Sequence, residues 1–181
     1  MTLTSRVRRW AYRSRQFFVA LLGTVSAAEM AEARRVLGPD LYSLFAALPQ
    51  QYRRHALNVY RRVVEAGCSD IDVWEAALLH DAGKFDPISG RYVTIFHRVA
   101  VVLLEIAPGG RFVLRKLSRL RRLRDFVLYP FYLSLHHPYL GARLAAERGA
   151  SGAVVELIAS HHKRSGRSAQ LMVLQAADDR S

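Results

Sequence analysis

Strong helix-stop signals divide almost the whole of this 181-residue chain into helix-length segments. Gly38-Pro39, Ala66-Gly67 and Gly149 each follow a segment with the helical spacing of apolar residues. The sequence shows neither the alternating pattern of strands nor Asn-Gly hairpin signals. The length fits about one domain, and 51% hydrophobic residues are enough for one core. We therefore predict a single all-α domain.

Start and stop signals also place the individual helices. We expect helices over residues 27–37, 40–48, 49–65, 91–107, 111–129, 139–148 and 152–162, another from Asp70 or Asp72 to the pair His80-Asp81, and a last one that carries Asp178. Ser26 with Glu29 three residues later has the pattern of a capping box. Ser151 is the expected cap of helix 152–162, and Pro138 is the expected start of helix 139–148.

Basic residues outnumber acidic residues by 27 to 15, which gives a formal net charge of +12 and a pI near 10.7. This balance predicts attraction to polyanions such as nucleotides, nucleic acid or an anionic membrane face. The charge forms two blocks: Arg6, Arg8, Arg9, Arg13 and Arg15 near the N-terminus, and Arg111, Arg115, Lys116, Arg119, Arg121, Arg122 and Arg124 further along.

We interpret residues 1–25 as a basic amphipathic arm suited to contact a membrane or a partner, and residues 26–181 as the domain. A secretory signal is the alternative for the arm, but the apolar stretch from Phe17 to Leu22 is short for one. No run reaches the ~18 apolar residues of a membrane span. We expect a cytoplasmic protein that can contact a membrane peripherally.

Histidine and aspartate residues are concentrated at a few places in the chain. Six of the seven histidines belong to these places, and only His97 stands apart. The places are His55, His80-Asp81, His136-His137, His161-His162 and Asp178. Imidazole and carboxylate groups bind divalent transition metals, and the single cysteine, Cys68, excludes thiolate-rich zinc sites and iron–sulfur clusters. Ligands on four or five separate helices can converge only inside a helical bundle.

In their order, these residues resemble the HD-domain metal-dependent phosphohydrolases, and in particular the subgroup with an HDIG-like signature. The matching elements are His55, His80-Asp81-Ala82-Gly83-Lys84, His137-Pro138-Tyr139-Leu140-Gly141-Ala142, His161-His162, and Asp178 after Ala176-Ala177. The resemblance covers residues ~50–179, most of the chain. It implies an HD-type helical bundle, here with a basic helical insertion at residues 91–135.

The resemblance also implies a site for one or two divalent metal ions (Mn, Fe, Co, Ni, Zn or Mg). The implied ligands are His55, His80, Asp81 and Asp178 for one ion, and His137, His161 and His162 for a second. Asp81 would bridge the two ions, and Asp81 and Lys84 are the candidate catalytic residues. Lys84 would neutralise charge that develops on phosphate. Adjacent His161 and His162 should point about 100° apart on a helix, which favours different ions or a substrate contact for one of them.

The implied activity is hydrolysis of a phosphomonoester or phosphodiester by metal-activated hydroxide, with a nucleotide as the expected substrate. The alternative is an HD module that binds a nucleotide for signalling and turns it over slowly or not at all. Lys163 follows His161-His162, so the chain lacks the Gly-Tyr-Pro triplet of the cyclic-dinucleotide phosphodiesterase branch.

Two ligand positions have a neighbouring residue as an alternative, and Lys84 has an alternative structural role. His136 competes with His137 as a ligand, but the Pro that follows favours His137 and leaves His136 near the site or in solvent. Asp179 competes with Asp178, which directly follows the small pair. Lys84 could instead cap the end of its helix through the helix dipole.

The segment 91–135 is expected to cover the site or to extend the bundle. Its first helix is apolar enough to be buried, and its second is amphipathic and basic. The arginines of the second helix are either simply solvated, or they form an electropositive rim that attracts an anionic substrate or docks on anionic lipid.

Overall fold

The computed structural model describes residues 23–119, 126–164 and 168–181. Most of the expected N-terminal arm lies outside these ranges, as do Arg121, Arg122 and Arg124 of the second basic block. The described residues are all-α, and the β-type pairing among them is limited to an isolated bridge between Phe85 and Tyr92. The predicted all-α class is therefore confirmed.

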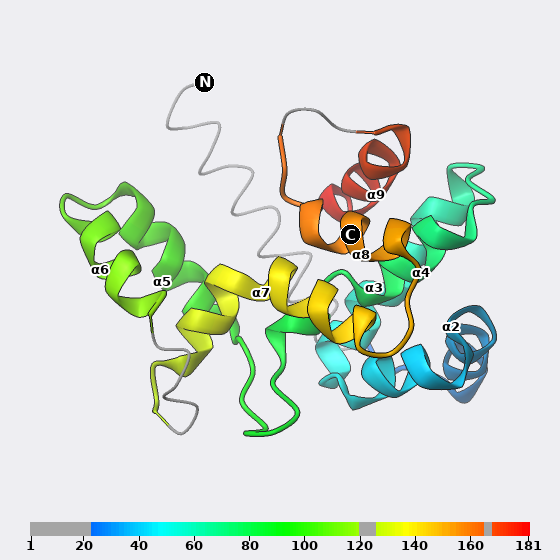
Figure 1. Cartoon of the computed structure of the whole chain (residues 1–181), viewed down its shortest axis with the longest axis horizontal. Helices are drawn as coiled ribbons and strands as arrows, with labels where there is room; N and C mark the ends of the chain where they lie inside the picture. The colour runs from blue at the N-terminus through cyan, green and yellow to red at the C-terminus, as the bar shows by residue number, and fades with distance from the viewer. Residues whose placement is uncertain (1–22, 120–125, 165–167) are drawn as a thin grey trace.

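Eight α-helices and one 3-10 turn make up this part of the chain (Figure 1). They are α2 (Ala27–Ala47), α3 (Gln50–Glu65), α4 (Ile71–Leu79), the turn η1 (Ala82–Lys84), α5 (Ile95–Ile106), α6 (Gly110–Leu117), α7 (Tyr129–Ala146), α8 (Gly152–Ser160) and α9 (Ala169–Asp179). The expected capping box of Ser26 and Glu29 and the expected Ser151 cap are both present. Asp70, rather than Asp72, caps α4.

The short helix α4 lies at the centre of the bundle. Helices α2, α3, α8 and α9 all pack against it. Val73 and residues 76–79 are buried, so α4 is apolar on most sides. Burying a leucine such as Leu78 or Leu79 contributes roughly 2 kcal/mol relative to exposure. The packing therefore fixes the helix whose end carries the pair His80-Asp81.

The expected break at Gly38-Pro39 is a sharp bend within α2. Gly38 has φ 66° and ψ 177°, which is not helical, and helical structure resumes at Pro39. Glycine adopts this positive φ without the steric cost that a Cβ would bring. The two expected short helices are thus two arms of one bent element.

Helix α7 is longer than the sequence suggested. The expected start at Pro138 is wrong, because α7 begins at Tyr129 and runs through Pro138. Tyr129, Tyr132 and Leu133 pack into a second small core with Val93, which supports the first half of the helix. The last residues of the expected insertion 91–135 therefore belong to the same helix as His137.

The insertion differs from expectation in two further ways. The expected helix 111–129 ends as α6 at Leu117, and residues 126–128 form a bend and turn before α7. The expected burial of the first helix is also wrong, since Val101 is the one buried residue of α5. The principal neighbours of α5 are α6 and α7, and Figure 1 shows this pair of helices at one end of the molecule. An isolated hairpin of this kind has too few neighbours to cover an apolar helix.

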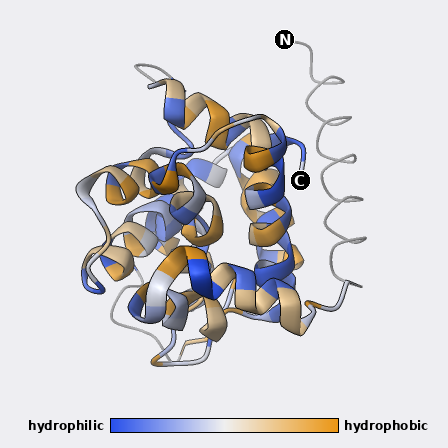
Figure 2. Cartoon of the chain, turned by 90° about the vertical axis from the view of Figure 1, so that its right-hand side faces the viewer, coloured by the Kyte–Doolittle hydropathy of each residue, from blue (hydrophilic) through white to orange (hydrophobic). Residues whose placement is uncertain are grey.

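Apolar and polar residues are mixed along the helices (Figure 2). Among the described residues, no helix combines the length and the apolar character needed to cross a bilayer.

A buried carboxylate ties the start of α2 to α3. Glu29 accepts hydrogen bonds from the backbone N–H of Ser26 and from Arg54, at 2.7 Å each, and it also pairs with Arg61. The hydrogen bond from Arg54 is the largest influence on the pKa of Glu29 and holds it well below its usual range, against the opposing effect of burial.

We expect Glu29→Gln to lower the free energy of unfolding by about 1–2 kcal/mol at neutral pH, because charged hydrogen bonds become weaker ones. A lowered folded-state pKa stabilises the protein above the unfolded pKa of about 4.3 and loses this contribution as the pH falls below it. Urea unfolding at several pH values measures this, and the gap between wild type and variant should narrow below about pH 4.3. If the difference in unfolding free energy between wild type and variant did not change with pH, the ionised carboxylate of Glu29 would not be the source of the stabilisation.

Candidate metal centre

The end of α4 delivers His80 and Asp81 into the interior, where they are 1% and 3% exposed. His80 is the residue that caps α4, and its Nδ1 lies 2.9 Å from the carbonyl of Ala77. That carbonyl is one of the last four of the helix, which have no partner within it. The hydrogen bond fixes the imidazole ring and leaves Nε2 directed away from α4.

The same arrangement occurs at two more histidines. Nδ1 of His137 lies 2.8 Å from the carbonyl of Ser134, and Nδ1 of His161 lies 2.7 Å from that of Ile158. A carbonyl oxygen can only accept, so Nδ1 carries the proton in all three rings. In the neutral ring Nε2 then keeps its lone pair. Such partners fix the tautomer and orientation of metal-binding histidines.

Pro138 explains how His137 obtains this partner in the middle of a helix. In a regular helix, the N–H of residue 138 would donate to the carbonyl of Ser134. Proline has no N–H, so this carbonyl is left without its helical donor. The imidazole of His137 donates to it instead. Because of Pro138, His137 makes the same hydrogen bond to a free carbonyl in the middle of α7 that His80 and His161 make at the ends of α4 and α8.

The carboxylate of Asp81 lies where these rings converge. Its Oδ1 is 3.6 Å from Nε2 of His80, 3.7 Å from Nε2 of His137 and 4.0 Å from Nε2 of His161. Its Oδ2 is 2.7 Å from Nζ of Lys84 and 3.9 Å from Nε2 of His55. One carboxylate therefore faces ligand atoms from α3, α4, α7 and α8.

A first group of possible metal ligands consists of His55, His80 and Asp178, whose ligand atoms all lie within 4.8 Å of one another. His55 comes from α3 and Asp178 from α9, and Nε2 of His55 is 3.0 Å from Oδ1 of Asp178. Nε2 of His80 is 3.7 Å from the same oxygen. The structure thus brings residues 123 positions apart into one cluster.

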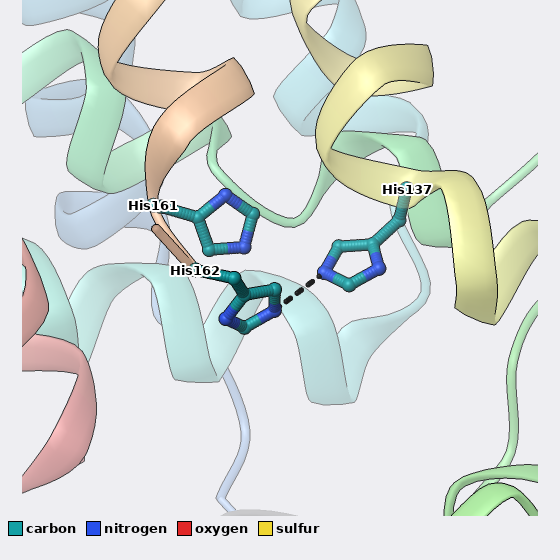
Figure 3. A group of neighbouring side chains, drawn as sticks. All are labelled: His137, His161 and His162. Atoms are coloured by element: carbon teal, nitrogen blue, oxygen red, sulfur yellow. Dashed lines mark hydrogen bonds between the residues drawn. The ribbon is translucent and has the colours of Figure 1, made fainter. Parts of the chain in front are cut away.

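A second group consists of His137, His161 and His162, again with ligand atoms within 4.8 Å (Figure 3). Nε2 of His137 lies 3.0 Å from Nε2 of His162. The expected divergence of His161 and His162 does not occur, and their ring centroids are 4.1 Å apart. The reason is that α8 ends at Ser160, so His162 lies in the turn beyond the helix.

Electrostatics favour the ionisation states that metal binding requires in His137, His161 and His162, which stay neutral, and in the two aspartates, which stay ionised. Burial lowers the pKa of His161 to about 3 and that of His137 well below its usual value. Burial raises the pKa of the Asp81 carboxyl, but Lys84 and the surrounding imidazoles outweigh it, so that pKa lies well below its usual range. The pKa of Asp178 is lowered in a similar way: burial raises it, and the hydrogen bond with His55, together with the electrostatic effects of His80 and His55, more than reverses this.

Two buried nitrogens indicate that a cation fits the site. Nε2 of His80 and Nε2 of His161 are buried, and neither has a hydrogen-bond partner. Leaving such a group unsatisfied costs about 1–3 kcal/mol. Both lone pairs also face the ionised Oδ1 of Asp81, an unfavourable arrangement without positive charge between them. Two ligands at about 2.1 Å from one ion lie at most about 4.2 Å apart, and the Asp81 distances meet this limit.

Lys84 is buried, and Asp81 holds its Nζ in the ion pair described above. Burial lowers the pKa of Lys84, and Asp81 opposes this in part. The ammonium group also lies 5.9 Å from the ring centroid of Tyr52. Lys84 therefore orients Asp81, and a contact with substrate phosphate remains a prediction.

Gly83 allows η1 to pack closely against α7. A Cβ at this position would lie 2.2 Å from the carbonyl oxygen of His137 and 2.6 Å from the nitrogen of Gly141. No side chain fits there, so the glycine sets the spacing between Asp81 and His137. The glycine is part of the His-Asp-Ala-Gly-Lys motif, but the motif alone does not indicate this packing role.

The structure leaves the two alternative ligands, His136 and Asp179, outside the clusters, and His97 also lies apart from them. Nε2 of His136 bonds to the carbonyl of Ser118, at the end of α6, 3.1 Å away. His97 bonds to Thr94 at the start of α5. Asp179 is exposed next to Asp178. The sequence did not indicate that the carbonyl of Ser134 orients His137. It also did not indicate that the ring of Tyr52 lies near Lys84, with its hydroxyl donating to the carbonyl of Val93.

No family model, curated protein or solved structure matches the chain. The evidence that the His-rich clusters could bind a metal ion is therefore the arrangement of their ligand atoms.

We expect added Mn²⁺, Co²⁺, Ni²⁺ or Zn²⁺ to stabilise the protein, because the ion binds the folded cluster and not the dispersed ligands of the unfolded chain. An ion at 100 times its Kd contributes about 2.7 kcal/mol, which corresponds to a Tm rise of about 5–10 °C for a chain of this size. Differential scanning calorimetry with and without a chelator measures the shift. An unchanged Tm with every ion would contradict a metal site.

We expect Pro138→Ala to weaken metal binding by about 10-fold, the lower end of the range for lost partners of ligand histidines. The new N–H at position 138 would compete with His137 for the carbonyl of Ser134. The helix itself should gain stability. Isothermal titration with a single metal measures the affinity. Pro130→Ala, at the start of the same helix, is the control and should leave it unchanged. Equal affinities in the two variants would contradict the role of Pro138.

Proposed function

We propose that this chain is a metal-dependent phosphohydrolase of the HD type that cleaves a phosphomonoester or phosphodiester, with a nucleotide as the favoured substrate class. The observation that carries the proposal is the pair of three-residue clusters that meet at Asp81. Mixed imidazole and carboxylate donors suit Mn, Fe, Co, Ni or Zn. The order of these residues along the chain adds the resemblance to the HD-domain pattern.

Each cluster would hold one metal ion in this proposal. His55, His80 and Asp178 would hold one ion, and His137, His161 and His162 a second, with Asp81 between them. Bound ions would supply Lewis-acid polarisation of the phosphoryl group and a water of lowered pKa. Lys84 fixes the carboxylate of Asp81 through the ion pair and thus the position at which the two clusters meet.

We expect substrate to reach the site from the side of His162. Among the six residues of the two clusters, His162 is exposed, while His80, His137 and His161 are buried. Substrate would therefore approach past His162 and meet a buried set of imidazoles. The net charge of +12 favours an anionic substrate such as a phosphoester.

The decisive experiment compares Asp81→Asn with His97→Gln after loading with the same metal. Asp81→Asn should lower kcat/KM for generic phosphomono- and diesters by on the order of 10²–10³-fold, the usual effect of losing a group that stabilises transition-state charge. His97→Gln should keep activity, because His97 lies outside both clusters and Gln can take its capping position.

Equal activity in the two variants would rule out the metal-hydrolase proposal. Calorimetry with a nucleotide panel tests the signalling alternative. Tight nucleotide binding without product release would support a catalytically weak binding module instead.

A further inference from the structure

The outer face of α5 carries a continuous stripe of large apolar side chains. Phe96, Val99, Leu103 and Ile106 are 80%, 38%, 56% and 59% exposed. Their spacings of three, four and three residues place them along one side of the helix. Single exposed apolar residues are ordinary on protein surfaces, but a contiguous patch marks a surface that something else covers.

The same end of the molecule holds most of the exposed apolar residues of the described chain. Of fifteen large exposed hydrophobic residues, eleven lie between Ile88 and Leu128. Besides the α5 stripe they include Phe112 and Val113 on α6 and residues 126–128 before α7. We call α5, α6 and their connection, residues 95–117, the apical hairpin.

Exposed basic residues lie on the second helix of the apical hairpin and just after it. Arg111, Arg115, Lys116 and Arg119 are exposed on or just after α6. Nζ of Lys116 lies 4.6 Å from the ring centroid of Phe112, so charge and apolar surface are in direct contact. Long basic side chains can keep their charge in water while their stems cover apolar surface.

The hairpin is closely packed and projects from the bundle. At Gly110 a Cβ would lie 1.8 Å from the carbonyl oxygen of Leu104, so α6 starts directly against α5. Figure 1 shows α5 and α6 at one end of the molecule, away from α2, α3, α4 and α9. The apolar stripe therefore belongs to a fixed element that can meet a flat surface without rearrangement of the core.

We propose that the apical hairpin docks this protein on the surface of an anionic lipid bilayer. The α5 stripe would enter the boundary between headgroups and acyl chains, and the basic residues would pair with lipid phosphates. With 12 residues, α5 is about 18 Å long, too short to span a bilayer but suited to lie in its interface. Each basic residue near an anionic surface adds to the attraction.

Two other occupants fit the observations less well. Nucleic acid would use the basic residues, but it offers little to the aliphatic side chains of Val99, Leu103 and Ile106. A second copy of the chain would cover the apolar stripe but would bring two strongly basic hairpins together. The inference does not depend on the proposed hydrolase activity, because it uses residues outside the metal centre.

The test is flotation of the full chain with vesicles of neutral lipid, with and without about one third anionic lipid. The variant Phe96→Ser/Leu103→Ser should bind anionic vesicles at least about 10-fold more weakly than wild type, since both apolar contacts with the interface are lost. Val64→Ser/Met172→Ser is the matched control, because both residues are exposed on other helices, and it should bind as wild type does. Arg115→Gln/Arg119→Gln should also weaken binding, most clearly at low salt.

Five outcomes would overturn the proposal. Wild-type protein could fail to bind anionic vesicles. All variants, including the arginine variant, could bind as well as wild type, which would assign binding to another segment such as residues 1–22. Weakening by the arginine variant alone would indicate simple electrostatic adsorption. Analytical ultracentrifugation that shows a dimer abolished by Phe96→Ser/Leu103→Ser would identify a second copy as the occupant. An oligonucleotide bound through Arg115 and Arg119, with no vesicle binding, would identify nucleic acid.

Discussion

The carboxylate of Asp81 is the point on which the bundle is organised. Ligand atoms from α3, α4, α7 and α8 lie within 4.0 Å of its two oxygens, and α9 joins through Asp178. An ionised group in this position needs positive charge nearby, because burial alone would favour its protonated form. Lys84 supplies one positive charge, while burial lowers the pKa values of His137 and His161, the imidazoles on another side of the carboxylate. The helices thus enclose two groups of side chains that could hold a metal ion beside this carboxylate.

The positions at which helices end determine how the histidines of the site are oriented. α4 and α8 each stop at a histidine, and Pro138 creates an equivalent free carbonyl inside α7. Gly83 then lets η1 approach α7 so closely that Asp81 reaches the ring of His137. Core packing around α4 fixes these ends in space, so the geometry of the centre follows from how the helices pack and where they stop.

Sequence patterns predicted the parts that depend on local chemistry. Caps at Ser26 and Ser151 and the turn at Gly38 follow from neighbouring residues, and the fold class follows from periodicity. The course of α7 through Pro138 was not predictable in this way, because tertiary contacts of Tyr129 and Leu133 override a local helix-start signal. The exposure of α5 was missed for a related reason: apolar content shows that a surface must be covered, but not by what. The convergence of His161 and His162 depends on a helix end displaced by two residues from the predicted one.

The use of backbone carbonyls to orient three histidines has a consequence for how such a site can change. In many metal centres a carboxylate side chain orients the imidazole, and a single substitution can remove it. Here the partners are the main-chain oxygens of Ala77, Ser134 and Ile158, which every amino acid possesses. Side chains at those three positions can therefore vary without removing the orienting bond. Residues around the exposed His162 could therefore change while the orientation of the buried histidines stayed the same.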